Sequence, residues 1–220
     1  MLHVPQRSQS FAPVDSCRPV LRLSGKPVAA IGLLVAALQS APAMAHDGTG
    51  LAGGFVAGFL HPVTGFDHML AMVSVGLWGA FLGRPLLIVL PMLFPAMMAA
   101  GAGAGMAGLP LPSVELGIAA SVITLGAMIL FAVRAPVAIA CAIVAVFALF
   151  HGYAHGTELP SAADPTGYTA GFVLCTGLLH LTGIALGTLK ASAVGTIALR
   201  SLGGVIAVIG GWFLAGALAA

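Results

Sequence analysis

The sequence predicts an all-α integral membrane protein with six transmembrane helices, and three observations support this fold class. Of the 220 residues, 60% are hydrophobic and only 6% are charged, whereas about a quarter of the residues in a soluble domain are charged. So few charges cannot cover a water-facing surface, so the solvent for most of the chain must be lipid. The apolar residues are grouped into segments separated by short polar links. The 30 glycines include pairs with the small-xxx-small spacing of packed transmembrane helices, at Gly54/Gly58, Gly101/Gly105 and Gly183/Gly187.

Residues 1–45 are predicted to be a cleaved signal peptide. Four basic residues precede an apolar run at 28–38, and Ala43-Met44-Ala45 then forms a small-x-small cleavage signature. A run of about eleven residues is too short to cross ~30 Å of hydrocarbon. An uncleaved signal anchor is the alternative, and the long basic leader leaves the true start open. Cleavage would leave residues 46–220 as a single polytopic domain in the bacterial inner (plasma) membrane, with a periplasmic N-terminus.

The six spans are expected at 66–83, 86–108, 113–133, 136–152, 167–189 and 197–219, with a shorter apolar segment at 50–60. As one helix, residues 49–83 would measure about 52 Å, far longer than one span needs. Pro62-Val63-Thr64-Gly65 interrupts this stretch. We therefore expect a short broken or re-entrant half-helix before the first full span. Helices broken at membrane depth line cavities and commonly mark transporter binding sites.

The basic residues after the presequence predict the orientation of the spans. Arg84 and Arg134 follow the first and third spans, and Lys190 and Arg200 flank the link after the fifth span. The links at 109–112 and 153–166 contain no Lys or Arg. Six spans with an external N-terminus therefore place every basic residue in the cytoplasm, as the positive-inside rule requires.

The first group of candidate metal ligands lies at the helix break. His61 precedes the break, and Asp67 and His68 fall in the first turn of the following span. Two imidazoles and a carboxylate suit a borderline divalent ion such as Ni²⁺, Co²⁺ or Zn²⁺. The alternative for Asp67 is a capping-box pattern with Thr64, which would leave the two flanking histidines unexplained.

The second group of candidate ligands is His151, His155 and Glu158. Spacings of four and seven residues place these side chains on one helical face. Two histidines at i and i+4 can chelate one ion. The alternative is a polar helix end that emerges at the surface before Pro160.

Two further candidates are less distinctive. Glu115 begins the third span on the predicted external side, where an acid also stabilises the start of a helix. His180 lies about 20 Å into the fifth span; it is either an inner relay ligand or a buried histidine bonded to Thr176 or a backbone carbonyl. Ionisable groups inside spans cost roughly 2.5–3.5 kcal/mol each, so they usually face a partner or a pathway.

Other features give weaker indications. If cleavage follows Ala45, the free amine, His46 and Asp47 form a weak capture site for Ni²⁺ or Cu²⁺, unless the terminus is disordered. The methionines are interpreted as packing residues. The three cysteines show no CxxC spacing, so neither a disulfide framework nor a thiolate metal site is expected.

Two long motifs resemble those of the HupE/UreJ family of nickel and cobalt permeases. The first runs from His61-Pro through Gly65-Phe-Asp67-His68 to Val75-Gly-Leu-Trp78, and the second is Phe150-His-Gly-Tyr-Ala-His-Gly-Thr-Glu158. The segments Leu90–Pro95 and Glu115–Ser121 are similar too, so the resemblance covers essentially the whole mature chain. It implies secondary transport of Ni²⁺ or Co²⁺. The functional positions that it implies are His61, Asp67, His68, Glu115, His151, His155 and Glu158, with Phe94 as a further candidate.

The expected function is thus uptake of nickel or cobalt ions by a permease that is not an enzyme. The chain has no GxxxxGK[ST] loop, so nucleotide hydrolysis by that route is excluded. No permanently bound cofactor is expected. The expected partners are the lipid bilayer and the transported divalent ion, and no nucleic acid is expected. The sequence does not decide whether the protein forms a homo-oligomer. The alternatives are an intramembrane zinc-dependent hydrolase with Glu158 as general base, or a metal-sensing accessory membrane subunit.

Overall fold

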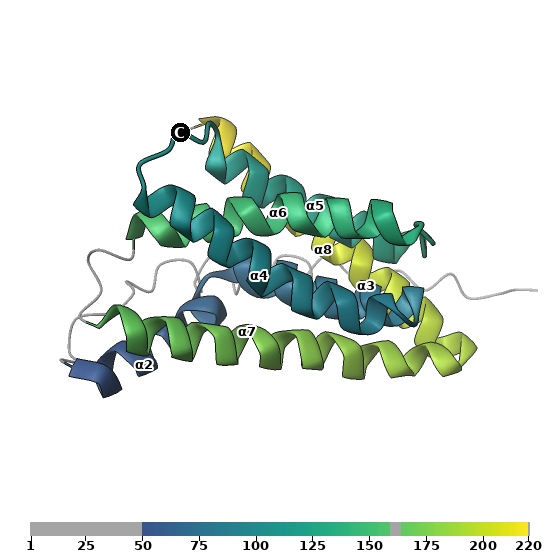
Figure 1. Ribbon diagram of the computed structural model, residues 1–220. Helices are drawn as coiled ribbons and strands as arrows, with labels where there is room; N and C mark the ends of the chain where they lie inside the picture. The colour runs from purple at the N-terminus through teal and green to yellow at the C-terminus, as the bar shows by residue number, and fades with distance from the viewer. Residues whose placement is uncertain (1–49, 159–163, 220) are drawn as a thin grey trace, which may run out of the picture. The chain divides into compact units, whose positions relative to one another are not determined.

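The computed structural model describes residues 50–158 and 164–219 (Figure 1). For Glu158 it describes the backbone but not the side chain. All regular structure in these residues is helical. The helices are α2 (Gly50–Thr64), α3 (Phe66–Leu82), α4 (Leu86–Met106), α5 (Val114–Leu130), α6 (Val137–Glu158), α7 (Pro165–Gly187), the short 3₁₀ helix η2 (Thr188–Ala191) and α8 (Ala193–Ala219). The predicted signal peptide, Cys17, His46 and Asp47 lie outside the described residues.

The expected all-α membrane fold is confirmed at the level of its helices. In the described part of the chain, α4, α6, α7 and α8 are each long and apolar enough to cross a membrane, and α2 and α3 together pass the same test as one bent span. Length and composition thus support up to five spans. The remaining predicted span, third in chain order, is α5. Its 17 residues lie at the lower end of the range that can cross a bilayer.

The first span is broken, as predicted, and the break lies at Gly65, the last residue of the predicted interruption. Helix α2 continues through Pro62 to Thr64, and α3 then leaves at an angle of 79°. The backbone N–H of Gly65 donates to His61 O at 3.0 Å and closes α2, while Gly65 O accepts from Met69 N at 2.9 Å and opens α3. Proline removes one helical donor without ending the helix here, and Gly65 provides the extended residue at which the direction changes.

Helices α3 and α5 form the interior of the bundle. Helix α4 packs on α6, α5 on α8, and α7 on both α2 and α3. Between Ala71 and Ala80 every residue of α3 except Val73 is buried. Among the described residues, the large exposed hydrophobic side chains lie on α2, α4, α6, α7, α8 and the links, and none on α3 or α5. These exposed apolar surfaces suit contact with lipid.

Glycines set the closest helix contact near the two histidines of α6. A Cβ atom added at Gly152 would lie 2.0 Å from Met98 O, and one at Gly156 would lie 2.2 Å from Ala102 O. The backbones of α4 and α6 therefore touch directly at this level. These glycines pack against α4. The three predicted glycine pairs also lie at close helix contacts: Gly54/Gly58 against α7, Gly101/Gly105 against α6 and Gly183/Gly187 against α3.

Helix α6 extends beyond the predicted span. The span was expected to end at residue 152, but the helix continues to Glu158, in agreement with the helical spacing predicted for His151 and His155. The glycine contacts with α4 support this last part, and the Tyr153 hydroxyl donates to Leu109 O at 2.7 Å. Tertiary packing therefore outweighs the low helix propensity of two glycines.

The four basic residues after the presequence lie at one end of the bundle. The Lys190 ammonium donates to Ala80 O near the end of α3, and Arg200 Nε donates to Leu130 O at the end of α5, at 2.7 Å. Cations at these carbonyls are favourable, because the carboxyl end of a helix carries partial negative charge. Trp78 Nε1 also donates to Val133 O at 3.1 Å, next to Arg134. Helices α6 and α2 carry their histidines at the opposite end.

Candidate metal site

The two predicted histidine groups form one cluster. His68 of α3 lies between His151 and His155 of α6, with ring centroids 4.6 Å from each. His61 of α2 lies 4.8 Å from His155 and 6.2 Å from His68, centroid to centroid. Four imidazoles from three helices are therefore in contact, although the two motifs are far apart in the sequence. We call His61, His68, His151 and His155 the imidazole cluster.

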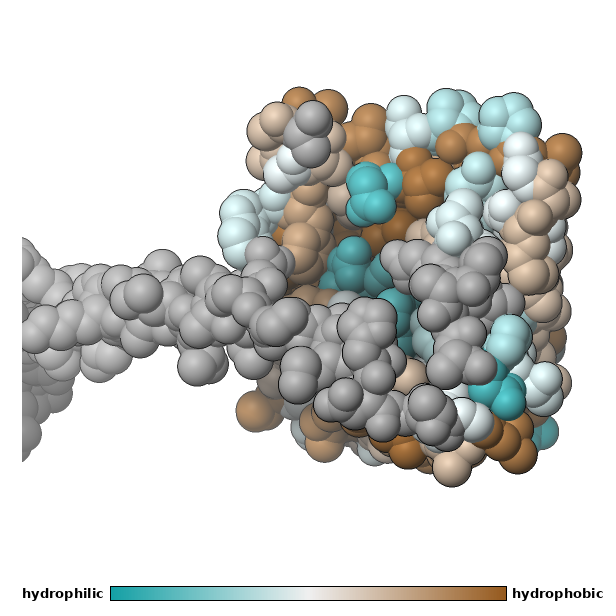
Figure 2. Space-filling model, turned by 90° about the vertical axis from the view of Figure 1, so that its left-hand side faces the viewer, coloured by the Kyte–Doolittle hydropathy of each residue, from teal (hydrophilic) through white to brown (hydrophobic). Residues whose placement is uncertain are grey.

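The imidazole cluster is largely buried. His151 is fully buried, and His155 and His68 are only 6% and 8% exposed. The end of the bundle at which α6 ends and α7 begins shows hydrophilic residues gathered in a hollow between hydrophobic ones (Figure 2). Burial of three titratable rings in an apolar bundle is costly, and such residues usually face a partner or a pathway.

Asp67 holds His68 in a defined orientation. One Asp67 carboxylate oxygen lies 2.8 Å from both the backbone nitrogen and Nδ1 of His68. The capping-box alternative is wrong: Gly65 is the N-cap of α3 with no side-chain cap, and the Thr64 hydroxyl donates to His61 O at 3.0 Å. A carboxylate that accepts from one ring nitrogen leaves the other nitrogen free to bind metal, as is usual in histidine metal sites. His68 Nε2 is buried and has no hydrogen-bond partner among the described residues.

His151 has a partner that the sequence analysis did not identify. Its Nε2 lies 2.9 Å from the hydroxyl of Ser121, a fully buried residue of α5. Gly117, one turn earlier in α5, packs against the ring of Phe150, so the two helices are close at this level. A serine in an apolar helix usually bonds to its own backbone, so the sequence offered no signal for this contact.

The imidazole cluster is not arranged as a coordination sphere. In the described part of the chain, no three His, Cys, Asp or Glu side chains are placed to hold one metal ion together. The rings meet mostly edge to face, at 88° for His68 and His151 and 78° for His61 and His155. The structure therefore brings the ligand types together without converging their nitrogen atoms, and side-chain rotation is needed for an ion to be shared.

The other predicted ligands lie apart from the imidazole cluster. Glu115 is exposed in the first turn of α5, where it forms no hydrogen bond or ion pair with another described residue. The side chain of Glu158 lies outside the described residues. His180 of α7 is almost fully buried deeper in the bundle, with a relative exposure of 1%. The alternative of a bond with Thr176 is wrong, because neither the Thr176 hydroxyl nor His180 Nε2 has a hydrogen-bond partner in the described part.

Phe94 links the imidazole cluster to His180. Its fully buried ring lies 5.8 Å from the ring of His151 and 5.3 Å from that of His180, centroid to centroid. The ring of Phe172 similarly contacts His155, at 4.4 Å. Histidines and aromatic rings thus form a continuous row from His61 to His180.

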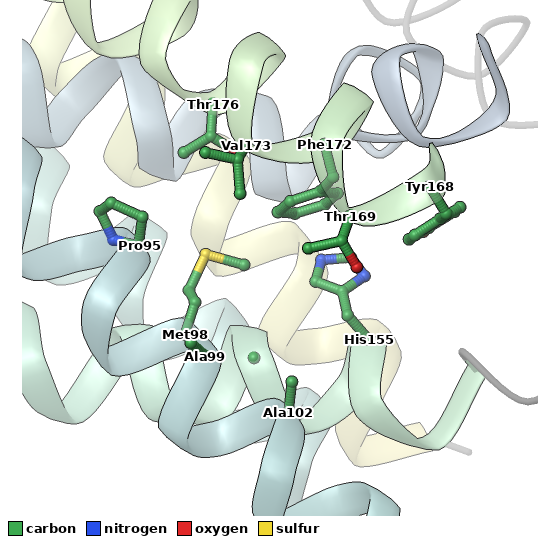
Figure 3. A pocket seen from close by; sticks show the side chains of 11 residues that line it. Pro95, Met98, Ala99, Ala102, His155, Tyr168, Thr169, Phe172, Val173 and Thr176 are labelled. Atoms are coloured by element: carbon green, nitrogen blue, oxygen red, sulfur yellow. The ribbon is translucent and has the colours of Figure 1, made fainter. Parts of the chain in front are cut away.

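A side pocket of about 90 Å³ reaches the imidazole cluster between α4, α6 and α7. Figure 3 shows the His155 ring beside Thr169 and Phe172, with Pro95 and Met98 on the α4 side. The lining is predominantly apolar, and Ala99, Thr169 and Val173 in its wall are exposed on the outer surface of the bundle. An opening of this kind between apolar helices suits contact with lipid more than with a hydrated ion.

Comparison with known proteins identifies the family. The family model described as HupE / UreJ protein matches residues 29–213. The chain belongs to the HupE/UreJ family. It is also similar to Protein HupE of Rhizobium leguminosarum bv. viciae, with 43% identity over 176 residues that cover 80% of this chain and 92% of the relative. No solved structure matches.

The range matched by the HupE/UreJ family model spans the imidazole cluster, Asp67, Ser121 and His180. Membership supports the resemblance drawn from the two histidine motifs. The geometry adds that these motifs meet across α2, α3 and α6, and that α5 contributes a hydroxyl.

Proposed function

We propose that the chain is a secondary permease that takes up Ni²⁺ or Co²⁺ across the bacterial inner membrane, and that it is not an enzyme. The observation that supports this most directly is the imidazole cluster, in which four histidines from three helices are in ring contact at one end of an apolar bundle. Imidazole suits Ni²⁺ and Co²⁺, and affinity order alone does not choose between them.

In this proposal the bundle crosses the membrane six times, with α5 as the third span. The end that carries Lys190 and Arg200 faces the cytoplasm, as the positive-inside rule requires. The imidazole cluster then lies toward the periplasm, as does the N-terminus that cleavage after Ala45 would create. This orientation makes the imidazole cluster an entry site for the ion.

The membrane potential suffices to drive uptake in this mechanism. A dication that moves inward down ~100 mV gains roughly 4.6 kcal/mol, which is equivalent to more than about a thousandfold accumulation. The chain has no nucleotide-binding loop of the Walker type. Facilitated, potential-driven transport therefore requires no other energy source.

The ligands are proposed to act in sequence along the row of rings. Glu115 and Glu158 attract the ion at the periplasmic mouth, and the imidazole cluster with Asp67 replaces part of its water shell. The ion then passes Phe94 to His180. Conduction requires binding that is weak enough for release. Several weak binding sites that share the ion therefore suit transport better than one tight site. The absence of a preformed three-ligand site among the described residues is compatible with such weak binding.

Uptake by proteoliposomes tests the proposal. Purified protein is reconstituted into vesicles with an imposed inside-negative potential, and the entry of radioactive nickel or cobalt is measured against protein-free vesicles. We expect saturable entry that depends on the potential and decreases strongly in the double variant His68→Gln/His151→Gln. No entry with the wild-type protein, together with hydrolytic activity that needs stoichiometric Zn²⁺, would replace this proposal with the zinc-hydrolase alternative.

A further inference from the structure

Ser121 makes two short polar contacts in the interior of the bundle. Its Oγ lies 2.6 Å from Ile118 O, three residues earlier in α5, and 2.9 Å from His151 Nε2 on α6. Both Ser121 and His151 are fully buried. The available protons must therefore be divided among the three atoms.

The number of available hydrogens determines this division. A carbonyl oxygen can only accept, so the contact with Ile118 O uses the single hydrogen of the Ser121 hydroxyl. Ser121 Oγ must then accept from His151, which requires the hydrogen of the neutral imidazole to be on Nε2. The remaining nitrogen, His151 Nδ1, therefore has the free lone pair. It is buried and has no hydrogen-bond partner among the described residues.

The neighbouring ring of His68 is held in the opposite form. An ionised Asp67 carboxylate can only accept, so His68 Nδ1 carries the hydrogen and Nε2 has the lone pair. The His68 and His151 rings are in contact at 4.6 Å, centroid to centroid. Two adjacent imidazoles from α3 and α6 thus offer different nitrogens, one through Nε2 and the other through Nδ1.

We propose that Ser121 is a positioning residue for metal binding, which fixes His151 in the Nε2–H tautomer so that Nδ1 binds the ion. This inference rests on the proposed permease function. A neutral hydroxyl acceptor increases the basicity of the ligand nitrogen less than a carboxylate does. His151, which contacts Phe94 on the inward side, is then a weaker ligand than His68. This difference favours release of the ion toward His180.

The tautomer is tested first, without any metal. The full-length protein, labelled with ¹⁵N at histidine, is placed in lipid nanodiscs at mildly alkaline pH, and the His151 signals are assigned by their loss in His151→Gln. We expect a protonated Nε2 and an unprotonated Nδ1 in the wild-type protein. Ser121→Ala should lose this signature, whereas Ser121→Thr, which retains the hydroxyl, should preserve it. A protonated Nδ1 in the wild-type protein overturns the proposal.

Binding of Co²⁺ is measured next, from its visible absorption bands. Loss of an outer-shell partner typically weakens metal affinity about 10–100-fold, and we expect that loss for Ser121→Ala and near wild-type affinity for Ser121→Thr. Ser74→Ala is the matched control, because Ser74 is a fully buried serine whose hydroxyl has no hydrogen-bond partner among the described residues. Equal weakening in Ser74→Ala and Ser121→Ala, or none in either, contradicts a role through His151.

The two proposals fail differently. If the expected His151 spectrum and Co²⁺ affinity of the wild-type protein are lost in Ser121→Ala, but the wild-type protein passes neither ion into vesicles, the positioning role is supported and the permease function is wrong. If the wild-type protein transports but Ser121→Ala retains both the spectrum and the affinity, the permease function stands and the positioning role is wrong.

Discussion

The Nδ1 atom of His68 and a carboxylate oxygen of Asp67 lie 2.8 Å apart, and the same oxygen also accepts from the backbone N–H of His68. The pair stands at the first turn after the break at Gly65. The change in direction at Gly65 therefore places an oriented imidazole against α6.

Replacement of Asp67 should weaken metal binding through His68. Asp67→Ala removes the acceptor of Nδ1–H, and we expect Co²⁺ affinity to fall about 10–100-fold, the usual cost of losing such a partner. Asp67→Asn retains an acceptor oxygen without the charge, so its Co²⁺ affinity should lie between those of the wild-type protein and Asp67→Ala. Titration of Co²⁺ absorption measures the effect. Equal affinity in all three proteins would show that His68 needs no carboxylate.

Acid should inhibit uptake. A protonated imidazole has no lone pair for a metal ion, and the ordinary histidine pKa is about 6.5. Protons and metal ions compete for the same imidazole lone pairs, so uptake should fall as the pH decreases from about 7.5 to about 4. The measurement is initial uptake rate in proteoliposomes at a constant imposed potential, with folding checked by size-exclusion chromatography. An unchanged rate over this range would contradict imidazole ligation.

Hydropathy and charge predicted the helical membrane fold because every span that lies in lipid must be apolar and poor in charge. The predicted helix starts lie within about four residues of the observed ones. The fourth predicted span ended at residue 152, whereas α6 continues to Glu158. Its last part is stabilised by contact of Gly152 and Gly156 with the α4 backbone. Contacts of that kind depend on the partner helix, which local sequence does not specify.

The candidate ligands were predicted as residues but not as one site. Spacing placed His151 and His155 on one face of a helix, and the same reasoning cannot show that this face meets His68. Ser121 was missed altogether, since a lone serine between Ala120 and Val122 has no distinguishing pattern. The burial of its hydroxyl against His151 becomes evident only when α5 and α6 are packed together.

A single added methyl group should separate α4 from α6. In Gly152→Ala the new Cβ would lie 2.0 Å from Met98 O, so the helices must move apart at the level of His151. Overpacking of this kind typically costs about 1–3 kcal/mol, and Co²⁺ binding should weaken as the imidazole cluster shifts. Gly177→Ala on α7 is the matched control, because its Cβ meets nothing within 4 Å. Thermal unfolding in detergent compares the two, and similar melting temperatures would argue against close α4–α6 contact.

The position of α5 decides between five and six spans. Leu109 and Phe131 lie just beyond the two ends of α5 and are 57% and 67% exposed. In a background with Cys141→Ala and Cys175→Ala, Leu109→Cys should react with a membrane-impermeant maleimide in intact spheroplasts. Phe131→Cys should react only after permeabilisation, because the positive-inside rule places the end near Arg134 in the cytoplasm. Val194→Cys, 79% exposed near Lys190, should behave like Phe131→Cys and serves as a second inner marker. Labelling of both Leu109→Cys and Phe131→Cys from the same side would mean that α5 does not cross the membrane, and His151 would then meet Ser121 on a re-entrant helix.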